Sequence, residues 1–466
     1  MNTSLNRRIN IGRDTAASIR RPCLLSALLP ALALAVSSCG GGDGGGGDGP
    51  GQQQLDLVIG NLLPLTGPSK ALGRSGEKAS DLAIERIEQA IEDADSDHTV
   101  RAVQEDQGKD DDASSEAAKT LVNDDSASCL TGPWSPDAVE RTAHDIAIPS
   151  KVLQIAPVPA DEEVTELSDR DLVESTALPE SLEGSALTKA IERDLGGVEG
   201  YTVNVAASND SYGDTLAQDF IETWQDEDGT VGGQVVLAQP PLSSSSSSGS
   251  SGSTGSSSTY SAQAQQITTG SPDAVVLIDD VNGFSLLAPA LSSSFGWDPG
   301  TAWGSDQLVS PAIPALVGSE AVDGMRALAP GTPKGETASS AFVQEFKSAD
   351  PRDVKQGPFA AQEFDAVMLC YLAAVASGST DGQQMADELI DITAPGGDQF
   401  SWQQLPDAVS ALEDGEDIDY VGASGPIDMD VRGNPTSGVF DIYQYLGERL
   451  EVVGEVSVEK PNPAGP

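Results

Sequence analysis

Residues 55–94 read LDLVIGNLLPLTGPSKALGRSGEKASDLAIERIEQAIEDA and contain one complete strand–loop–helix unit. The apolar run at 55–63 predicts a buried β-strand, which ends at Pro64 and the loop at 66–68. Residues 75–94 predict an amphipathic helix, because their apolar side chains recur near helical spacing. These side chains are Ala79, Leu82, Ala83, Ile87 and Ile91. A buried strand followed by an amphipathic helix is the repeating unit of α/β proteins.

The same alternation continues along the chain. Further strands are predicted at residues 99–104, 128–131, 152–155, 201–206, 235–237, 273–278, 438–445 and 450–456. Further helices are predicted at residues 113–122, 136–146, 182–194, 215–224, 262–267, 360–376, 384–391 and 405–412. Strands separated by helices form parallel sheets with right-handed crossovers. With this many units, we expect an α/β protein with two doubly wound parallel-sheet lobes rather than one sheet.

One internal segment does not fit the alternation. Residues 243–258 read SSSSSSGSSGSTGSSS and contain no apolar side chain. Such a segment has nothing to bury, so it predicts a disordered surface loop. Because the alternation resumes directly after it, we place the loop inside a lobe rather than between two lobes.

The composition narrows the class of function. The chain has 466 residues with 73 Asp and Glu, 25 Lys and Arg, and a formal net charge of −48. A nucleic-acid-binding surface needs a basic stripe, so nucleic acid is not an expected partner. Two His and four Cys offer little for metal or thiol chemistry, although carboxylates alone could still hold a hard cation such as calcium. Acidic residues occur in every segment, which predicts a solvated surface adapted to salty surroundings.

The N-terminal residues have the features of an export signal. Five arginines precede the apolar run CLLSALLPALALAV at residues 23–36. This run is too short to span a bilayer and is interrupted by Pro30, so we interpret residues 1–38 as a signal peptide.

The residues that follow indicate a lipid anchor. The sequence VSSCG at 36–40 resembles a bacterial lipobox, and its cysteine, Cys39, would then carry the lipid. The alternative is an ordinary signal peptide with an incidental cysteine. Residues 39–54 are rich in glycine and predict a flexible tether that separates the folded body from a membrane.

Two cysteines, Cys129 and Cys370, lie in the folded body in apolar contexts. In an exported protein two thiols could form one disulfide. Burial as two small apolar side chains is an equal alternative.

A series of short motifs resembles the type I periplasmic binding proteins of the leucine/isoleucine/valine-binding family. In chain order they read IGNLLPLTGP at 59–68, QEDQ at 104–107, LTGPWS at 130–135, DSYG at 210–213, SPDAVV at 271–276, FDAV at 364–367, and GPIDMD with GNP at 425–435. No single motif is specific, but together they cover nearly all of residues 55–456. The resemblance implies two lobes joined by a three-stranded hinge, with crossings near residues 175–181, 328–334 and 422–426.

These crossings define the expected domains. The first lobe comprises residues 55–178 and 331–424, and the second lobe comprises residues 179–330 with the serine-rich loop. Residues 425–466 hold the third crossing and the C-terminal strands of the second lobe. The resemblance implies that a solute binds in the cleft and that the lobes close over it by hinge bending.

The resemblance also implies partners for an amino-acid solute. Ser135 precedes Pro136 at a predicted helix start, where it would bind the solute carboxylate or simply cap its own helix. Ala160 stands where the family has a second carboxylate-binding hydroxyl, so one contact is missing. Asp306 aligns with the acidic residue that binds the ammonium group.

Four more residues complete the expected site. Asp280 follows the strand at 273–278, where it would either cap the next helix or face the cleft and favour an amine. Tyr212 would contact the solute from the second lobe. Leu72 and Trp134 would contact it from the first lobe, or pack within their loops.

The expected function follows from this resemblance. The chain would be an exported, lipid-anchored receptor that passes a small amino-acid-like, amide or amine solute to an ABC permease. The alternative is a receptor of the same fold that signals to another membrane partner. No GxSxG or HExxH motif is present, so we predict no enzymatic activity, and we predict neither a cofactor nor a metal.

Overall fold

The computed structural model describes residues 54–159, 171–238, 257–294, 296–349 and 354–460. All of them belong to one compact unit. The predicted signal peptide, Cys39, Ala160 and most of the serine-rich loop lie outside the described residues. Within the described part of the chain, no helix is both long enough and apolar enough to cross a membrane.

The first lobe contains a five-stranded parallel sheet. Its strand order is β2-β1-β3-β4-β5. The strands are β1 (Asp56–Leu63), β2 (Thr99–Asp106), β3 (Cys129–Thr131), β4 (Leu153–Ala156) and β5 (Val173–Ser175). The order reverses between β1 and β3, and open α/β sheets bind ligands at such a point, at the carboxyl ends of their strands.

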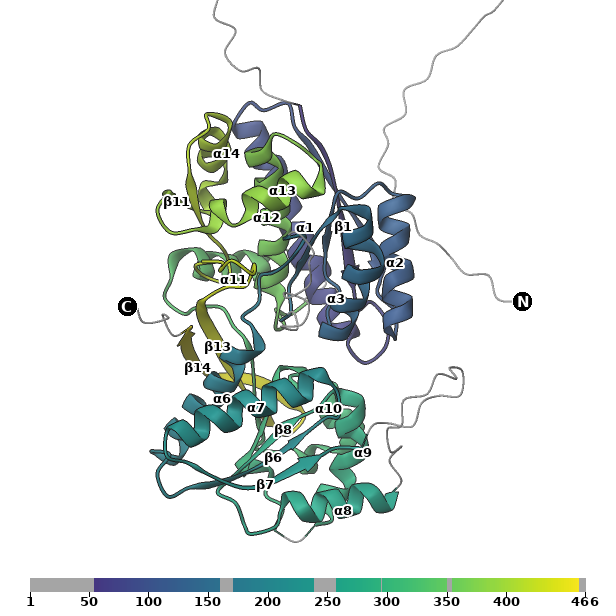
Figure 1. Cartoon of the computed structure of the whole chain (residues 1–466), viewed down its shortest axis with the longest axis vertical. Helices are drawn as coiled ribbons and strands as arrows, with labels where there is room; N and C mark the ends of the chain where they lie inside the picture. The colour runs from purple at the N-terminus through teal and green to yellow at the C-terminus, as the bar shows by residue number, and fades with distance from the viewer. Residues whose placement is uncertain (1–53, 160–170, 239–256, 295, 350–353, 461–466) are drawn as a thin grey trace, which may run out of the picture. The chain divides into compact units, whose positions relative to one another are not determined.

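Helices from two separate parts of the chain cover this sheet. The N-terminal part supplies α1 (Lys70–Asp93), α2 (Asp111–Asn123), α3 (Pro136–Thr142), a π-helical segment (Ala143–Ala147) and α4 (Ile148–Ser150). The later part supplies α11 (Thr337–Ser348), α12 (Ala360–Ser377), α13 (Gly382–Leu389) and α14 (Leu405–Glu413), with a small sheet of β11 (Asp398–Ser401) and β12 (Ile418–Val421). Residues 360–375 of α12 are all buried, so this helix is the centre of the first core (Figure 1).

The second lobe contains a seven-stranded sheet of order β14-β13-β10-β9-β8-β6-β7. Its strands are β6 (Thr202–Ala207), β7 (Thr230–Val236), β8 (Ala274–Ile278), β9 (Ala302–Gly304), β10 (Arg326–Pro330), β13 (Ser437–Leu446) and β14 (Arg449–Glu459). The first five repeat the parallel order of the first lobe. β13 pairs antiparallel with β10, and β14 pairs antiparallel with β13, so the C-terminal strands extend the predicted parallel sheet with an antiparallel pair.

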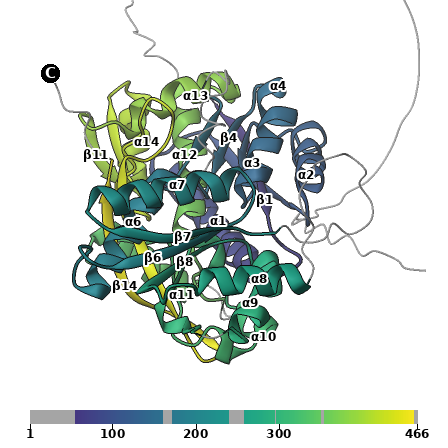
Figure 2. The ribbon, with the colours of Figure 1, turned by 60° about the horizontal axis from the view of Figure 1, so that its bottom comes forward.

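Helices cover both faces of the second sheet. These helices are α6 (Glu180–Leu195), α7 (Ser211–Asp226), α8 (Ser257–Ile267), α9 (Val281–Ser292) and α10 (Ile313–Val317). Val203 and Val205 of β6 pack in one core with α6 and α7, whereas Ala206 packs in another with α8 and α9 (Figure 2). The lobe is therefore doubly wound, as predicted. The first serines of α8, Ser257 and Ser258, are helical, so the predicted disordered loop ends earlier than expected.

A disulfide joins Cys129 in β3 to Cys370 in α12. Both cysteines are completely buried. Of the two alternatives that the sequence left open, the structure therefore shows the disulfide, and it links the N-terminal and later parts of the first lobe.

Three chain crossings connect the two lobes. The first leads from β5 to α6 and the second from β10 to α11, close to the predicted positions. The third lies later than the predicted residues 422–426, because Ile427 and Met429 still pack in the core of the first lobe. Asp365 of α12 explains the shift, since its carboxylate accepts hydrogen bonds from the backbone N–H groups of Ala423 and Ser424 and holds this segment on the first lobe.

Candidate ligand-binding site

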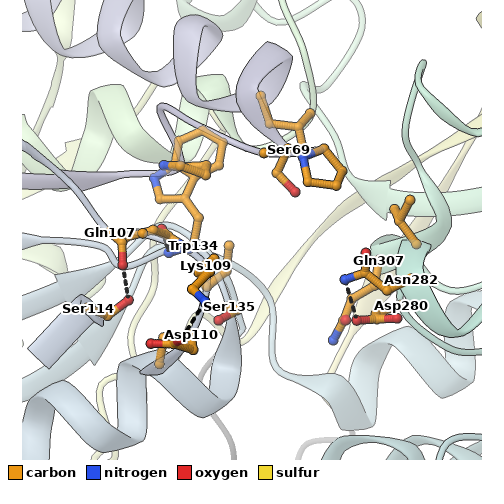
Figure 3. A pocket seen from close by; sticks show the side chains of 18 of the residues that line it. Ser69, Gln107, Lys109, Asp110, Ser114, Trp134, Ser135, Asp280, Asn282 and Gln307 are labelled. Carbon is orange, nitrogen blue, oxygen red and sulfur yellow. Dashed lines mark hydrogen bonds and ion pairs between the residues drawn. The ribbon is translucent and has the colours of Figure 1, made fainter. Parts of the chain in front are cut away.

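A cavity of about 400 Å³ lies at the carboxyl ends of strands from both sheets. Its volume is in the range typical of small-molecule sites. Figure 3 shows Gln107, Trp134 and Ser135 on one wall and Asp280, Asn282 and Gln307 on the other. The wall from the first lobe follows β1, β2, β3 and β4, and the wall from the second lobe follows β8 and β9.

The first-lobe wall contains an aromatic pair. The rings of Trp134 and Phe359 meet edge to face with their centroids 6.1 Å apart, and both line the cavity together with Leu72. Trp134 packs against α1 at Gly76, where a Cβ atom would lie 2.4 Å from the indole ring. A glycine is therefore needed there to keep the indole in this position.

Hydrogen bonds orient Trp134 from behind. Its backbone N–H donates to Gln107 Oε1 (2.9 Å), and its indole Nε1–H donates to Glu363 Oε2 (3.2 Å). Glu363 is a completely buried residue of α12. The aromatic wall is thus positioned by a carboxyl group that lies more than 200 positions further along the chain.

Two side chains, Thr131 and Trp134, donate hydrogen bonds to the buried carboxyl group of Glu363. Thr131 Oγ1 donates to Glu363 Oε1 (2.8 Å) and lies 3.0 Å from the side-chain amide of Asn61. Burial raises the pKa of Glu363 to about 7, and the hydrogen bonds from Thr131 and Trp134 partly offset this effect.

We predict that Glu363→Gln keeps these hydrogen bonds and stabilises the protein at alkaline pH. The folded-state pKa of Glu363 is raised, so the stability that comes from its neutral form is complete at low pH and is lost as pH rises towards 7. Glutamine does not ionise. We expect the free energy of unfolding of the variant, relative to that of wild type, to be about 1–3 kcal/mol higher at pH 8 than at pH 5. Melting curves at the two pH values measure this difference.

The control for this experiment is Glu92→Gln, which changes an exposed residue of α1. It should show no comparable change between the two pH values. A Glu363→Gln variant whose stability relative to wild type is the same at pH 5 and pH 8 would mean that Glu363 does not titrate in this range.

The second-lobe wall contains Asp306, which begins a short 3₁₀ turn (Asp306–Leu308) directly after β9. Asp306 lines the cavity, although only 5% of the residue is exposed. The hydroxyl of Tyr212 donates a hydrogen bond to Asp306 Oδ1 (2.6 Å). Burial raises the pKa of Asp306 to about 6, and the hydrogen bond from Tyr212 partly offsets this effect.

Asp280 has two roles in the structure. Its Oδ1 accepts a hydrogen bond from the backbone N–H of Gly283 (2.6 Å), so it caps α9 as one alternative predicted. It also lines the cavity beside Asn282, whose side-chain amide donates to Asp280 Oδ2 (3.3 Å). Capping and exposure to the cavity are therefore compatible.

The cavity is acidic. In the part of the chain that the structure describes, its charged lining residues are Lys109, Asp110, Asp111, Asp280 and Asp306. The side chain of Lys109 is 81% exposed and lies 3.8 Å from the Asp110 carboxylate. Because solvent and this carboxylate screen its charge, the lysine adds little positive potential to the cavity. An ammonium group therefore suits the second-lobe wall better than a carboxylate does. No cluster of three or more potential metal ligands occurs in the described ranges.

The structure brings together five of the seven predicted solute-binding residues. Leu72, Trp134, Ser135, Asp280 and Asp306 all line the cavity. Ser135 occupies the N-cap position of α3, but its hydroxyl makes no capping hydrogen bond, so the capping alternative is not observed. Ala160 lies outside the described residues.

Tyr212 is placed differently from the prediction. It is 4% exposed, packs in the core of the second lobe and is not among the lining residues. Its hydroxyl reaches Asp306 instead. The structure thus shows a residue that supports the cavity wall from behind rather than one that forms it.

This architecture, with two doubly wound lobes and a cavity at the carboxyl ends of both sheets, is that of a two-lobed solute-binding protein. The chain belongs to the periplasmic binding protein family, whose model matches residues 56–430. This result confirms the predicted family and fold class, and it identifies the chain as a binding protein rather than an enzyme. The family also implies a location outside the cytoplasm.

Individual relatives are distant in sequence. The chain is 21% identical to the chemotactic signal transduction system substrate-binding protein BasB of Halobacterium salinarum, over 85% of this chain and 88% of that protein. It is similar to the structure of the leucine binding protein LivK of Thermotoga maritima, with 19% identity and a TM-score of 0.65 over 87% of this chain and 99% of that one. It is also similar to an R. palustris solute binding protein in complex with benzoate, with 18% identity and a TM-score of 0.58 over 87% and 98%.

Proposed function

We propose that this protein is a receptor that binds a small amine-bearing solute and passes it to an ABC permease. The observation that carries this proposal is the acidic second-lobe wall, where Asp306 and Asp280 line a cavity whose single cationic lining residue, among those that the structure describes, is the exposed Lys109. A buried carboxylate without a fixed cation is a suitable partner for an ammonium group. The solute classes that fit are amino-acid-like compounds, amides and amines.

The first-lobe wall favours a solute with an apolar body. Trp134, Phe359 and Leu72 offer aromatic and aliphatic surface to it. The Ser135 hydroxyl makes no capping hydrogen bond, which leaves it available to a polar group of the solute. Alanine at position 160 supplies no hydroxyl, so a carboxylate would have fewer partners here than in the family pattern.

We further propose that Cys39 carries a lipid that anchors the chain to a membrane through the glycine-rich tether. The lipobox-like sequence at residues 36–40 supports this proposal. The strongly acidic composition supports adaptation to salty surroundings.

Signalling is the second candidate function. The similarity to BasB, a protein named for chemotactic signal transduction, favours a receptor that reports solute occupancy to a membrane partner other than a permease. Both functions require the same solute-binding step, so the ligand test below applies to both.

Three matched solutes test the proposed ligand class. Leucine carries an ammonium group and a carboxylate, leucinamide carries only the ammonium group, and 4-methylpentanoate carries only the carboxylate. We expect leucine and leucinamide, but not 4-methylpentanoate, to raise the melting temperature, and calorimetry to give 1:1 binding. Urea, putrescine and benzoate extend the set. If only 4-methylpentanoate and benzoate bind, the proposed ligand class is wrong.

A further inference from the structure

A second buried carboxyl group lies directly behind Asp306. Glu183 of α6 is completely buried, and its Oε1 accepts a hydrogen bond from the backbone N–H of Asp306 (2.8 Å). Its other oxygen, Oε2, is also buried and has no hydrogen-bond partner among the described residues. Glu183 does not line the cavity, so it can reach a solute only through Asp306.

The described groups that face this carboxyl pair are acidic or neutral. Glu180, one turn earlier on α6, is also buried and acts on Glu183 as a like charge. Tyr212 of α7 faces Asp306 with its hydroxyl, and the turn after β9 contributes Asp306 itself. None of the described ion pairs includes Glu183 or Asp306. Two neighbouring buried carboxyl groups without a cation do not both ionise readily.

We propose that Glu183 is a positioning residue that links solute binding to a proton: the Asp306–Glu183 pair holds a proton in the empty protein and releases it to solvent when an ammonium group binds Asp306. The positive charge of the ammonium group then replaces that of the released proton, so the net charge of the site does not change. This proposal rests on the proposed amine-bearing solute.

The electrostatics of the pair agree with this geometry. Burial, followed by the charge of Asp306, raises the pKa of Glu183 well above its usual range, and burial raises the pKa of Asp306 to about 6. Burial also raises the pKa of Tyr212, so its hydroxyl keeps its proton and continues to donate to Asp306. Because the two carboxyl groups interact, the proton belongs to the pair rather than to one residue.

The test is calorimetry of putrescine and leucine binding between pH 5 and pH 7.5, in buffers with different ionisation enthalpies. With an Asp306 pKa of about 6, affinity at pH 5 should be about tenfold weaker than at pH 7.5, and binding near pH 6 should release a measurable fraction of a proton. In Glu183→Gln, the loss of affinity on acidification should occur at a lower pH than in wild type. Fewer protons should be released when the solute binds. The control, Glu192→Gln, removes an exposed carboxylate from the same helix and should behave like wild type.

A second readout needs no solute. A group with a raised folded-state pKa destabilises the fold increasingly as pH rises, so the melting temperature of Glu183→Gln relative to wild type should increase from pH 5 to pH 8. The proposal is overturned if the melting temperatures of Glu183→Gln and wild type differ by the same amount at pH 5 and pH 8. It is also overturned if the affinity of the variant depends on pH as that of wild type does. Either result would give Glu183 a purely structural role. Amine binding that does not change with pH would overturn the proton linkage alone. Binding of carboxylate solutes only would overturn both the linkage and the proposed ligand class.

Discussion

Asp306→Asn is expected to weaken the binding of leucine or putrescine by about 2–4 kcal/mol at pH 7.5, or roughly 30- to 1,000-fold. Asp306 is the buried carboxyl group that lines the cavity, and Tyr212 donates a hydrogen bond to its Oδ1. Asparagine has nearly the same shape but no charge, so an ammonium group would be buried beside a neutral amide. Calorimetry on the purified variant measures this loss directly.

Two further variants make the result specific. Tyr212→Phe removes the hydroxyl but not the charge of Asp306, so it should weaken binding by a smaller factor. Asp226→Asn changes an exposed residue of α7 by the same unit of charge and should leave affinity unchanged. If Asp306→Asn binds both solutes as tightly as wild type, the solute does not contact this part of the cavity.

Removing the disulfide is expected to have the largest effect on stability. The double variant Cys129→Ala with Cys370→Ala should lose about 2–4 kcal/mol, because the bond closes a long loop between positions 241 residues apart and constrains the unfolded chain. For a domain of this size the melting temperature should fall by roughly 5–15 °C. Scanning calorimetry with and without a reductant measures the change.

The reductant provides its own control. It should lower the melting temperature of wild type towards that of the double variant and leave the double variant unchanged. Equal melting temperatures for wild type and the double variant under oxidising conditions would show that the bond contributes nothing to stability.

Much of the fold was predictable because buried strands and helices require apolar side chains at regular positions in the sequence. The strand at residues 55–63 and the helix at residues 360–376 agree with β1 and α12 to within a residue or so at each end. The antiparallel pairing of β13 with β10 was not predictable, since an apolar run has the same spacing in either direction. The position of the third crossing was missed because it depends on Asp365, which binds residues 423 and 424 from a distant helix.

The cavity residues were predictable where they follow strands. Trp134, Asp280 and Asp306 lie just after predicted or family-matched strands, and parallel sheets bring such positions together. Phe359 and Glu363 were missed because they come from the later part of the chain and reach the first-lobe wall only through folding. Glu183 looks like any acidic residue on a predicted helix, and no local pattern indicates that it is buried beside Asp306.

The disulfide has a consequence for the order of export. In a chain that crosses a membrane N-terminus first, Cys129 emerges long before Cys370, so the disulfide can form only after the 241 residues up to Cys370 have followed. The intervening chain contains five of the seven strands of the second sheet, β6 to β10, whereas β13 and β14 follow Cys370. The central part of the second lobe can therefore begin to assemble while Cys129 is still an unpaired thiol. The sequence contains only two other cysteines, Cys23 and Cys39. If the signal peptide is removed and Cys39 is acylated as proposed, no competing thiol remains, and the correct pair is the only one that can form.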